Sequence, residues 1–177
     1  MTIYTGRGDA GWTELRGGAR ISKASPRIES YGTIDEVNAL IGRVRPTDHD
    51  DVDDDLQAVQ NDLHVIQAEL AAPEADASDP RITTEDIERL EGWIDRYEAE
   101  LDPLQHFILP GGGECGSRLH HARTVCRRSE RRITDLNQAE PVRDEVVVYV
   151  NRLSDLLFVL ARAVNARECV SEESPTY

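Results

Sequence analysis

Apolar residues recur at steps of three and four positions through most of this chain, the spacing that lines one face of an α-helix. Pro46 and Pro73 end the first two such stretches, and Gly111, Gly112 and Gly113 precede the fourth. No internal repeat and no convincing pair of strands is visible. The pattern predicts helices over residues 27–44, 56–70, 83–101, 114–137 and 142–168. We therefore expect an all-α fold, a single-domain five-helix bundle with up-and-down packing and a glycine-rich N-terminal arm.

The length of the chain, 177 residues, suits one domain with a sizeable core. We divide it into an arm over residues 1–26, a helical bundle over 27–169 and a tail over 170–177. The apolar runs are far too short to span a bilayer, and no basic and then apolar leader follows Met1. We expect a cytoplasmic protein with no membrane partner. Its three cysteines resemble no disulfide framework.

Acidic residues outnumber basic ones by 34 to 20, which gives a net charge of −14. This charge argues against nucleic acid as a partner, since affinity for the phosphate backbone requires a basic surface. Residues 48–102 hold 19 acidic residues and three arginines, whereas the rest of the chain holds 15 acidic and 17 basic residues. We interpret residues 48–55 as a solvated acidic connection. We expect the acidic side chains of residues 48–102 to form a solvated outer face of the protein. The rest of the chain is free to bind an anion.

Lysine is almost absent: of the 20 basic residues, 19 are arginine and only Lys23 is lysine. An acidic surface of this kind is typical of salt-adapted proteins, in which a high net charge maintains solubility. A GC-rich genome is the alternative explanation. Because a compact ammonium and a planar guanidinium are not interchangeable, we expect a specific contact to hold Lys23.

Glycines are closely spaced in the N-terminal arm, at Gly6, Gly8 and Gly11. The arm lacks the βαβ unit that a dinucleotide-binding loop requires, and no Gly-Lys-Ser/Thr sequence makes it a Walker A loop. Closely spaced glycines nevertheless allow successive backbone amides to point at an anion, with Thr5, Thr13 and the lysine as further donors. The alternative is a flexible glycine-rich tail.

The predicted helix over residues 114–137 carries a dense run of arginine. Four charged residues share one of its faces, at i, i+4, i+7 and i+8: Arg123, Arg127, Glu130 and Arg131. Three further arginines lie beside this face or a turn earlier: Arg128, Arg132 and Arg118. Guanidinium groups bind phosphates and carboxylates through paired hydrogen bonds, so the face suits an anionic ligand. The alternative is a solvated face that forms ion pairs with the acidic helices.

The last predicted helix places polar residues among apolar ones, at Asn151, Asp155 and Arg162. Buried polar groups need partners, so we expect Asn151 either to orient a polar ligand or to form a hydrogen bond between helices. His120 and His121, with cysteines nearby, match no zinc-ligand spacing, and we predict no protein metal site. No Ser-His-Asp or cysteine nucleophile motif is visible.

Together these features resemble the PduO-type ATP:cob(I)alamin adenosyltransferases, from residue 3 to about residue 162. The resemblance rests on motifs that occur in this order: Tyr4-Thr5-Gly6-Arg7-Gly8-Asp9-Ala10-Gly11-Trp12-Thr13, Ser22-Lys23, Tyr31-Gly32-Thr33-Ile34-Asp35-Glu36-Val37-Asn38 with Ile41-Gly42, Phe107-Ile108-Leu109-Pro110-Gly111-Gly112, Leu119-His120-His121-Ala122-Arg123-Thr124-Val125-Cys126-Arg127-Arg128-Ser129-Glu130-Arg131 and Asn151-Arg152-Leu153-Ser154-Asp155. The motifs are highly specific together, although each alone is weak. The chain departs from the family at Ala10, where lysine is frequent, and at Arg118, where a small residue is usual.

The resemblance implies a homotrimer of five-helix bundles whose active sites lie between neighbouring subunits. It implies that the arm folds over ATP and that arm and helix residues bind the nucleotide and its triphosphate: Thr5, Gly6, Arg7, Gly8, Asp9, Gly11, Thr13, Lys23, Arg127, Arg128, Glu130, Arg131 and Asn151. Phe107 matches the aromatic wall beneath the corrin, which helps to displace the lower ligand so that cobalt can be reduced to Co(I). Asp35 and Arg123 match a pair joined across the interface, and with Arg127, Glu130 and Phe107 they form the implied catalytic set.

The implied reaction transfers the 5′-deoxyadenosyl group of ATP to the cobalt of cob(I)alamin, giving adenosylcobalamin and triphosphate. Co(I) is itself the nucleophile, so the protein needs to supply positive charge, orientation and a dry pocket. The expected small-molecule partners are ATP, Mg²⁺ bound through the phosphates, and cobalamin. A reductase and an adenosylcobalamin-dependent acceptor enzyme are the expected protein partners. The alternative is a nonenzymatic cobalamin or nucleotide escort with the same trimeric bundle.

Overall fold

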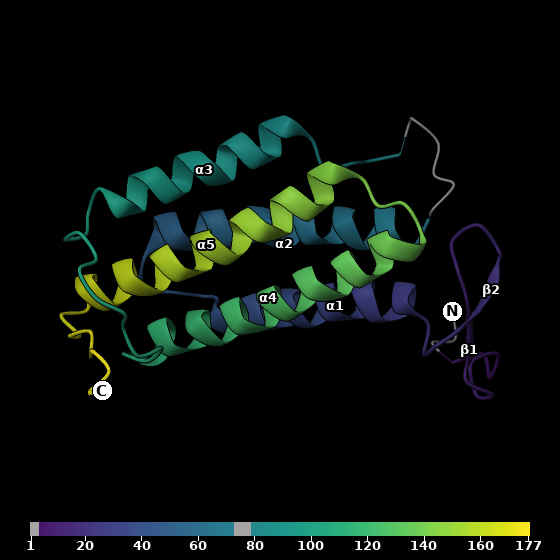
Figure 1. Cartoon of the computed structure of the whole chain (residues 1–177), viewed down its shortest axis with the longest axis horizontal. Coiled ribbons are helices and arrows are strands. Elements are labelled where there is room, and N and C mark those ends of the chain that lie inside the picture. Colours follow the sequence, from purple (N-terminus) through teal and green to yellow (C-terminus); the bar gives the residue numbers. More distant parts are fainter. Residues whose placement is uncertain (1–3, 73–78) are drawn as a thin grey trace.

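Five helices form the body of the protein in a computed structural model that describes residues 4–72 and 79–177. The helices are α1 (Pro26–Val44), α2 (Asp50–Leu70), α3 (Thr84–Glu98), α4 (Glu114–Ala139) and α5 (Asp144–Arg167). Successive helices run in opposite directions along the long axis (Figure 1). Helix α4 packs against α1 and α5, while α2 packs on α1 and α3 packs on α5. The predicted up-and-down five-helix bundle is confirmed.

The helix boundaries follow from capping chemistry. The Ser25 hydroxyl accepts a hydrogen bond from the backbone N–H of Ile28 at 3.3 Å, and Pro26 occupies the first turn of α1, where a missing N–H costs nothing. At the start of α3 the Asp86 carboxylate accepts a hydrogen bond from the backbone N–H of Thr83 at 2.9 Å. This is the contact of a capping box, and it satisfies a donor that the helix itself cannot pair.

Helix α2 begins at Asp50, so the prediction of a solvated connection over residues 48–55 is wrong. Acidic side chains in a first helical turn are stabilised by the positive end of the helix dipole, which explains how a run of aspartates can be helical. Val52 and Asp55 of this segment are both buried. The Asp55 carboxylate accepts a hydrogen bond from the Tyr97 hydroxyl at 2.8 Å and forms an ion pair with Arg96. The Asp55 carboxylate thus joins α2 to α3.

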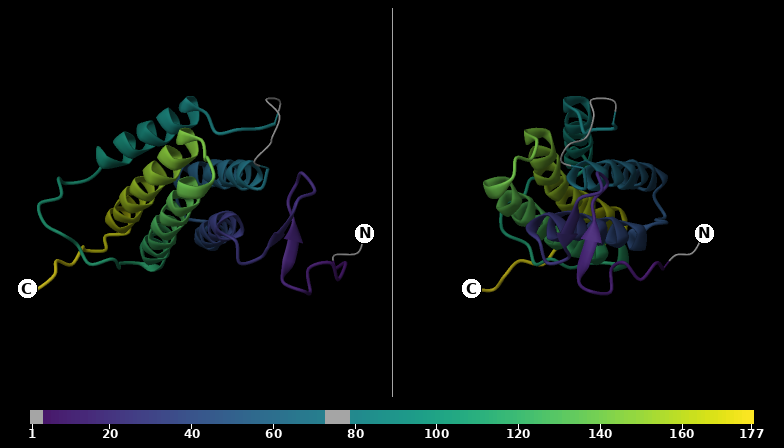
Figure 2. Two further views of the ribbon diagram at one scale, coloured as in Figure 1. Left: turned by 45° about the vertical axis from the view of Figure 1, so that its right-hand side comes forward. Right: turned by 90° about the vertical axis from the view of Figure 1, so that its right-hand side faces the viewer.

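The arm contains a pair of strands, which the sequence did not predict. Strand β1 (Trp12–Glu14) pairs antiparallel with β2 (Arg20–Ser22), in the register Thr13 opposite Ile21. Three residues are too few to give an alternating pattern. The two strands stand off from the end of the bundle where α1 begins (Figure 2). The backbone N–H of Arg16 donates to the Ala71 carbonyl at 3.3 Å, which ties the arm to the end of α2. Of the predicted extended pair at positions 3 and 4, the first lies outside the described residues.

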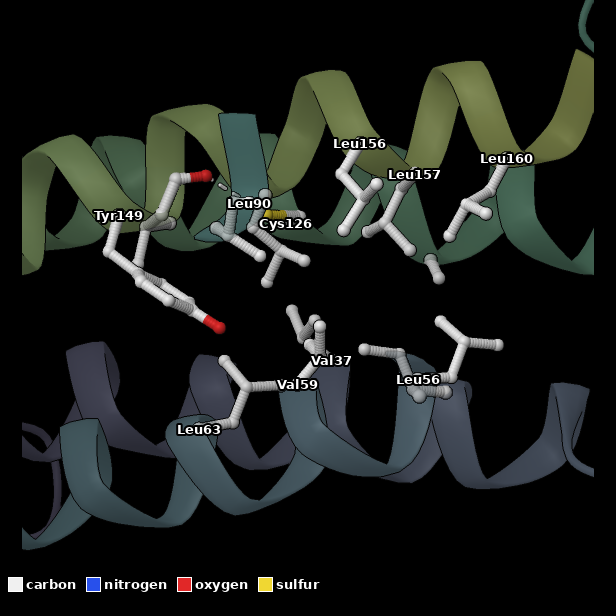
Figure 3. Close-up of a cluster of buried hydrophobic side chains, with 14 of the residues drawn as sticks. Val37, Leu56, Val59, Leu63, Leu90, Cys126, Tyr149, Leu156, Leu157 and Leu160 are labelled. Atoms are coloured by element: carbon white, nitrogen blue, oxygen red, sulfur yellow. Dashed lines mark hydrogen bonds between the residues drawn. The ribbon is translucent and has the colours of Figure 1, made fainter. Parts of the chain in front are cut away.

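The hydrophobic core lies between the α1–α2 pair and the α4–α5 pair. Figure 3 shows Val37, Leu56 and Val59 facing Leu157 and Leu160 across this layer, and all five are fully buried. Each buried side chain of this kind contributes roughly 1.5–3 kcal/mol. Because apolar side chains fill the space between the helix pairs, we look for the candidate site on the outer faces and at the ends of the bundle.

Two further features limit the search for a site. No helix in the described ranges 4–72 and 79–177 is long and apolar enough to cross a membrane. The cysteines Cys115, Cys126 and Cys169 are all free thiols. Burial raises the pKa of the Cys115 thiol to about 11, so this sulfur is protonated at neutral pH.

Candidate functional site

The N-terminal arm forms two consecutive turns. The backbone N–H of Asp9 donates to the Gly6 carbonyl at 3.3 Å, and that of Gly11 donates to the Gly8 carbonyl at 3.2 Å. Gly6 has φ +73° and Gly11 has φ +80°, both in the region that favours glycine. The spacing of these glycines is therefore required by the turns. Ala10 is exposed on the second turn.

Lys23 is attached to these turns through its backbone, and the specific contact predicted for its ammonium group stays a prediction. Its backbone N–H donates to the Gly11 carbonyl at 2.9 Å. A Cβ atom placed on Gly8 would lie 3.0 Å from the Lys23 Nζ, so the lysine side chain passes close over this glycine. Beside them is an open hollow of about 570 Å³ lined by Thr5, Arg7, Gly8, Trp12, Thr13, Glu14 and Arg20. Arg20 was missed by sequence reasoning because its short strand carries no periodic signal.

The arginines of α4 divide into two groups. The first group is paired with carboxylates of the same chain. Arg128 forms an ion pair with Glu36 of α1, and the Nε of Arg132 lies 3.3 Å from a carboxylate oxygen of Glu29. Arg118 pairs with the nearby Glu114 and also donates to the Arg43 carbonyl at 3.2 Å. These three side chains thus form ion pairs, but with carboxylates of α1 and of α4 itself and not with the acidic helices α2 and α3.

The second group comprises Arg123, Arg127 and Arg131, which have no carboxylate partner within residues 4–72 and 79–177. They stand at i, i+4 and i+8, on one face of α4. Arg131 and Arg127 are exposed, and Arg131 Nη1 donates to the Arg127 carbonyl at 2.9 Å. Burial and the neighbouring charge of Arg127 lower the pKa of Arg123. These three guanidinium groups form no ion pair in the described ranges, although Glu130 lies on the same face, and they make a surface that an anion would stabilise; we call it the arginine stripe.

Glu130 and Asn151 meet beside the arginine stripe. The Asn151 Nδ2 donates to the Glu130 Oε1 at 2.9 Å, which joins α5 to α4. The Asn151 carbonyl oxygen in turn accepts from Arg152 Nη1 at 3.0 Å, and Arg152 is anchored by Glu91 of α3 at 2.7 Å. The predicted hydrogen bond between helices is therefore present, and it also fixes both ends of a half-exposed amide. Asp155, in contrast, is fully at the surface.

Asp35 and Arg123 do not meet within one chain. Asp35 is exposed on α1 and accepts a hydrogen bond from Gln67 of α2 at 3.4 Å. The guanidinium of Arg123 lies over the ring of Phe158 of α5, 5.7 Å from its centroid, and the Arg123 Nε has no hydrogen-bond partner among the residues that the structure describes. The two side chains thus face neighbours on different helices, α2 and α5.

Phe107 also lies away from the arm. It belongs to the connection between α3 and α4, at the end of the bundle opposite to β1 and β2 (Figure 1), and it is 79% exposed. It lines a hollow of about 660 Å³ with Leu104, Gln105, His106, Ser174, Pro175 and Tyr177. No hydrogen bond or ion pair joins residues 4–25 to α4 or to this connection in the part of the chain that the structure describes. One subunit therefore does not bring all the predicted site residues together.

The chain is similar to known proteins over most of its length. The cobalamin adenosyltransferase family matches residues 3–164. The corrinoid adenosyltransferase of Bacillus subtilis (strain 168) is 43% identical over 177 residues, covering 97% of this chain and 91% of the relative. The corrinoid adenosyltransferase PduO of Salmonella typhimurium is 46% identical over 166 residues, which cover 92% of this chain but only 49% of the relative. This chain thus spans about half of that protein.

Solved structures give the same result at the level of the fold. An alanine variant of the PduO-type ATP:corrinoid adenosyltransferase from Lactobacillus reuteri, complexed with cobalamin and ATP, has a TM-score of 0.92 at 33% identity and covers 99% of this chain and 100% of its own. A lysine variant of the same enzyme, complexed with ATP, has a TM-score of 0.91 at 33% identity and the same coverage. The chain belongs to the cobalamin adenosyltransferase family.

Proposed function

We propose that this protein transfers the 5′-deoxyadenosyl group of ATP to the cobalt of cob(I)alamin, giving adenosylcobalamin and triphosphate. The observation that carries the proposal is the arginine stripe. In a chain of net charge −14, three adjacent guanidinium groups have no carboxylate partner in the described ranges, although acids neutralise their neighbours on the same helix. Membership of the cobalamin adenosyltransferase family supports the identity of the anion as the triphosphate of ATP.

The chemistry requires charge stabilisation more than a protein nucleophile. Co(I) supplies the electron pair that forms the cobalt–carbon bond. The bond between C5′ and its oxygen breaks, and triphosphate leaves with the electron pair of that C–O bond. Negative charge grows on the leaving oxygen, and Arg127 and Arg131 would stabilise it together with Lys23 from the arm. Preorganised donors of this kind are each worth about 2.7–4 kcal/mol in the transition state. Glu130 fixes the amide of Asn151 through the 2.9 Å hydrogen bond, and this amide would lie beside the nucleotide.

The arm supplies the backbone part of the ATP site. Successive amides in the turns of residues 5–11, with the hydroxyls of Thr5 and Thr13, can donate to phosphate oxygens. Mg²⁺ would enter with the phosphates. Residues 4–72 and 79–177 contain no group of three or more His, Cys, Asp and Glu able to hold a metal ion, so the phosphates would be its main ligands.

A homotrimer with shared sites is part of the proposal. Phe107, as the wall beneath the corrin, and the arm that would cover ATP lie at opposite ends of one bundle (Figure 1). A site that uses both needs more than one subunit. The unpartnered Nε of Arg123 would then be paired by Asp35 of a neighbouring subunit, since the two side chains face different helices within one chain. Arg128, already paired with Glu36, contributes less to phosphate binding in this arrangement.

The decisive experiment combines the purified protein with ATP and chemically reduced cobalamin under anaerobic conditions. We expect the visible spectrum of cob(I)alamin to be replaced by that of the alkyl cobalt product, with one triphosphate released per cobalt alkylated. Binding of both ligands without conversion would support the nonenzymatic escort instead. In the cell, a one-electron reductant must supply Co(I) and an adenosylcobalamin-dependent enzyme must accept the product. The cytoplasmic location remains a prediction from the sequence.

A further inference from the structure

The connection that carries Phe107, residues 99–113, is packed against the core at Leu101 but has little apolar packing after it. Phe107 is 79% exposed and Leu109 is 48% exposed. Beneath the second half of the connection is a cavity of about 410 Å³, lined by residues 108–112, His120, Asn165 and the tail residues 170–173. A segment over a cavity is not fixed by close packing. Its position must depend on polar contacts.

Two polar side chains of α5, one turn apart, provide those contacts. The Arg162 Nη2 donates to the Asp102 carbonyl at 3.2 Å, near the start of the connection. At its end, the Asn165 Nδ2 donates to the Gly111 carbonyl at 3.1 Å, and the Asn165 Oδ1 accepts from the backbone N–H of Gly113 at 3.0 Å. Asn165 and Arg162 are only 3% and 8% exposed. Buried hydrogen bonds of this kind are costly to break because the groups left behind lose all partners.

The C-terminal tail holds the middle of the connection. The backbone N–H of Leu109 donates to the Glu173 carbonyl at 2.8 Å. The tail itself is attached to the same turn of α5, because the Glu172 carboxylate accepts from the Arg162 Nε at 2.8 Å and the Val170 N–H donates to the Asn165 carbonyl at 2.8 Å. Asn165 and Arg162 therefore join the helix, the connection and the tail into one unit.

The glycines of this region are explained by Asn165. A Cβ atom on Gly112 would lie 2.2 Å from the Asn165 Nδ2, and one on Gly116 would lie 2.1 Å from its Oδ1. Gly112 also has φ +111°, which other residues rarely adopt. Any side chain at either position would expel the amide of Asn165. Gly112, before α4, and Gly116, in its first turn, thus make room for one buried amide.

We propose that Asn165, with Arg162 as its partner, is a positioning residue for Phe107 and so for the binding of the corrin. This inference deepens the proposed function and rests on it. The amide fixes the end of the connection six residues after Phe107 and, through the tail, its middle. The competing explanation is that Asn165 only caps the start of α4 through Gly113. A cap would affect stability alone, whereas a positioning residue affects the cobalamin site selectively.

The test compares Asn165→Ala with Asn165→Asp and with a matched control, Asn38→Ala. Asp keeps the acceptor for the Gly113 N–H and loses the donor to the Gly111 carbonyl. Asn38 is also a buried amide, 6% exposed, and its Nδ2 donates to the Gln60 carbonyl at 3.4 Å, within the α1–α2 pair. It therefore reports the cost of removing a buried amide far from the connection.

For Asn165→Ala we expect kcat/KM for cobalamin to fall about tenfold to hundredfold, since a displacement of about 1 Å can cost that much, while KM for ATP changes less than about twofold. Equilibrium dialysis should show weaker cob(II)alamin binding, and hydrogen exchange should become faster in residues 102–113. Asn165→Asp should have a smaller effect of the same kind. Asn38→Ala should lower the melting temperature without changing kcat/KM for cobalamin or KM for ATP.

Phe107→Ala separates a failure of this inference from a failure of the proposed function. If Phe107→Ala impairs cobalamin binding and Asn165→Ala leaves it unchanged at an equal or lower melting temperature, the positioning role is refuted. Equal losses for ATP and cobalamin in Asn165→Ala would also refute it and support the simple helix cap. If Phe107→Ala itself has no effect on cobalamin, the proposed role of Phe107 is wrong and the inference falls with it.

Discussion

Removal of Arg127 tests the arginine stripe most directly, because function and stability should respond in opposite ways. Arg127 is exposed and has no carboxylate partner within residues 4–72 and 79–177. Its nearest like charges, Arg123 and Arg131, lie one turn away on the same face. Arg127→Ala therefore removes repulsion and introduces the residue with the best helix propensity. We expect the free energy of unfolding to stay within about 0.5 kcal/mol of wild type or to rise.

The effect on turnover should be much larger. Two opposite unit charges 4 Å apart interact by about 4 kcal/mol at an effective dielectric constant of 20. Loss of one preorganised donor to a developing negative charge costs about 2.7–4 kcal/mol, which corresponds to a fall in kcat of about a hundredfold to a thousandfold. Arg127→Lys keeps the charge and loses the paired hydrogen bonds, so we expect an intermediate loss of about tenfold.

Arg132→Ala is the matched control. Arg132 is an exposed arginine of the same helix, but its Nε lies 3.3 Å from a carboxylate oxygen of Glu29 and it stands outside the stripe. Its loss should cost up to about 1 kcal/mol in stability and leave turnover within about twofold. The assay follows formation of the alkyl cobalt product in the visible spectrum at varied ATP. Equal losses in the two variants, or wild-type kinetics in Arg127→Ala, would refute the assignment of the stripe to the triphosphate.

Four further predictions concern the arm, the assembly and the electrostatics. Lys23→Arg should raise KM for ATP although charge is conserved, because the larger guanidinium cannot replace the ammonium over the glycine turn; unchanged ATP kinetics would contradict this. Arg123→Ala should weaken the proposed trimer and lower activity, as should Asp35→Ala, and light scattering that finds a fully active monomer would exclude the shared site. Raising KCl from 0.01 to 1 M should raise the melting temperature, because the Debye length falls from about 30 Å to about 3 Å and self-repulsion is screened; a flat or falling melting temperature would favour genome bias as the origin of the acidic composition. Hydrogen bonding by Arg167 holds the pKa of Asp51 at about 2, below its usual 3.8, so this pair should stabilise the fold above about pH 4 and lose that effect as pH falls toward 2. The melting-temperature gap between wild type and Asp51→Asn should close over that range, and a constant gap would show that the pair does not contribute.

Periodicity predicted the helices well wherever the buried stripe is apolar. It failed at the start of α2, where the buried positions include Asp55 and the exposed ones are aspartates as well. The partner that makes Asp55 tolerable is the Tyr97 hydroxyl, 42 positions away, and no local pattern reports such a contact. Periodicity did not predict the strands of the arm for a different reason. Each strand has only three residues, which are held by the turns around them and not by an apolar face.

The sequence named candidate site residues, whose roles stay predictions, but it did not predict how they are arranged. Helical spacing placed Arg123, Arg127 and Arg131 on one face, and it also gave Arg128 and Arg132 as neighbours. Spacing cannot say which guanidinium meets a carboxylate, because that depends on the acids of a second helix. Asn165 was missed for the same reason: its partners are backbone groups of a glycine run far away in sequence.

The pairing between α1 and α4 explains how an acidic protein keeps a cationic face. These helices pack against each other, and Glu29 and Glu36, seven residues apart on α1, meet Arg132 and Arg128, four residues apart on α4. The carboxylates of α1 thus neutralise the arginines on the flank of α4 that faces α1. Arg123, Arg127 and Arg131 form no ion pair with α1, α2 or α3 in the described ranges, and the charge of Arg127 lowers the pKa of Arg123, a repulsion that a bound anion would reduce. A ligand that relieves this repulsion stabilises only the folded protein, so we infer that ATP binding and the stability of α4 are coupled.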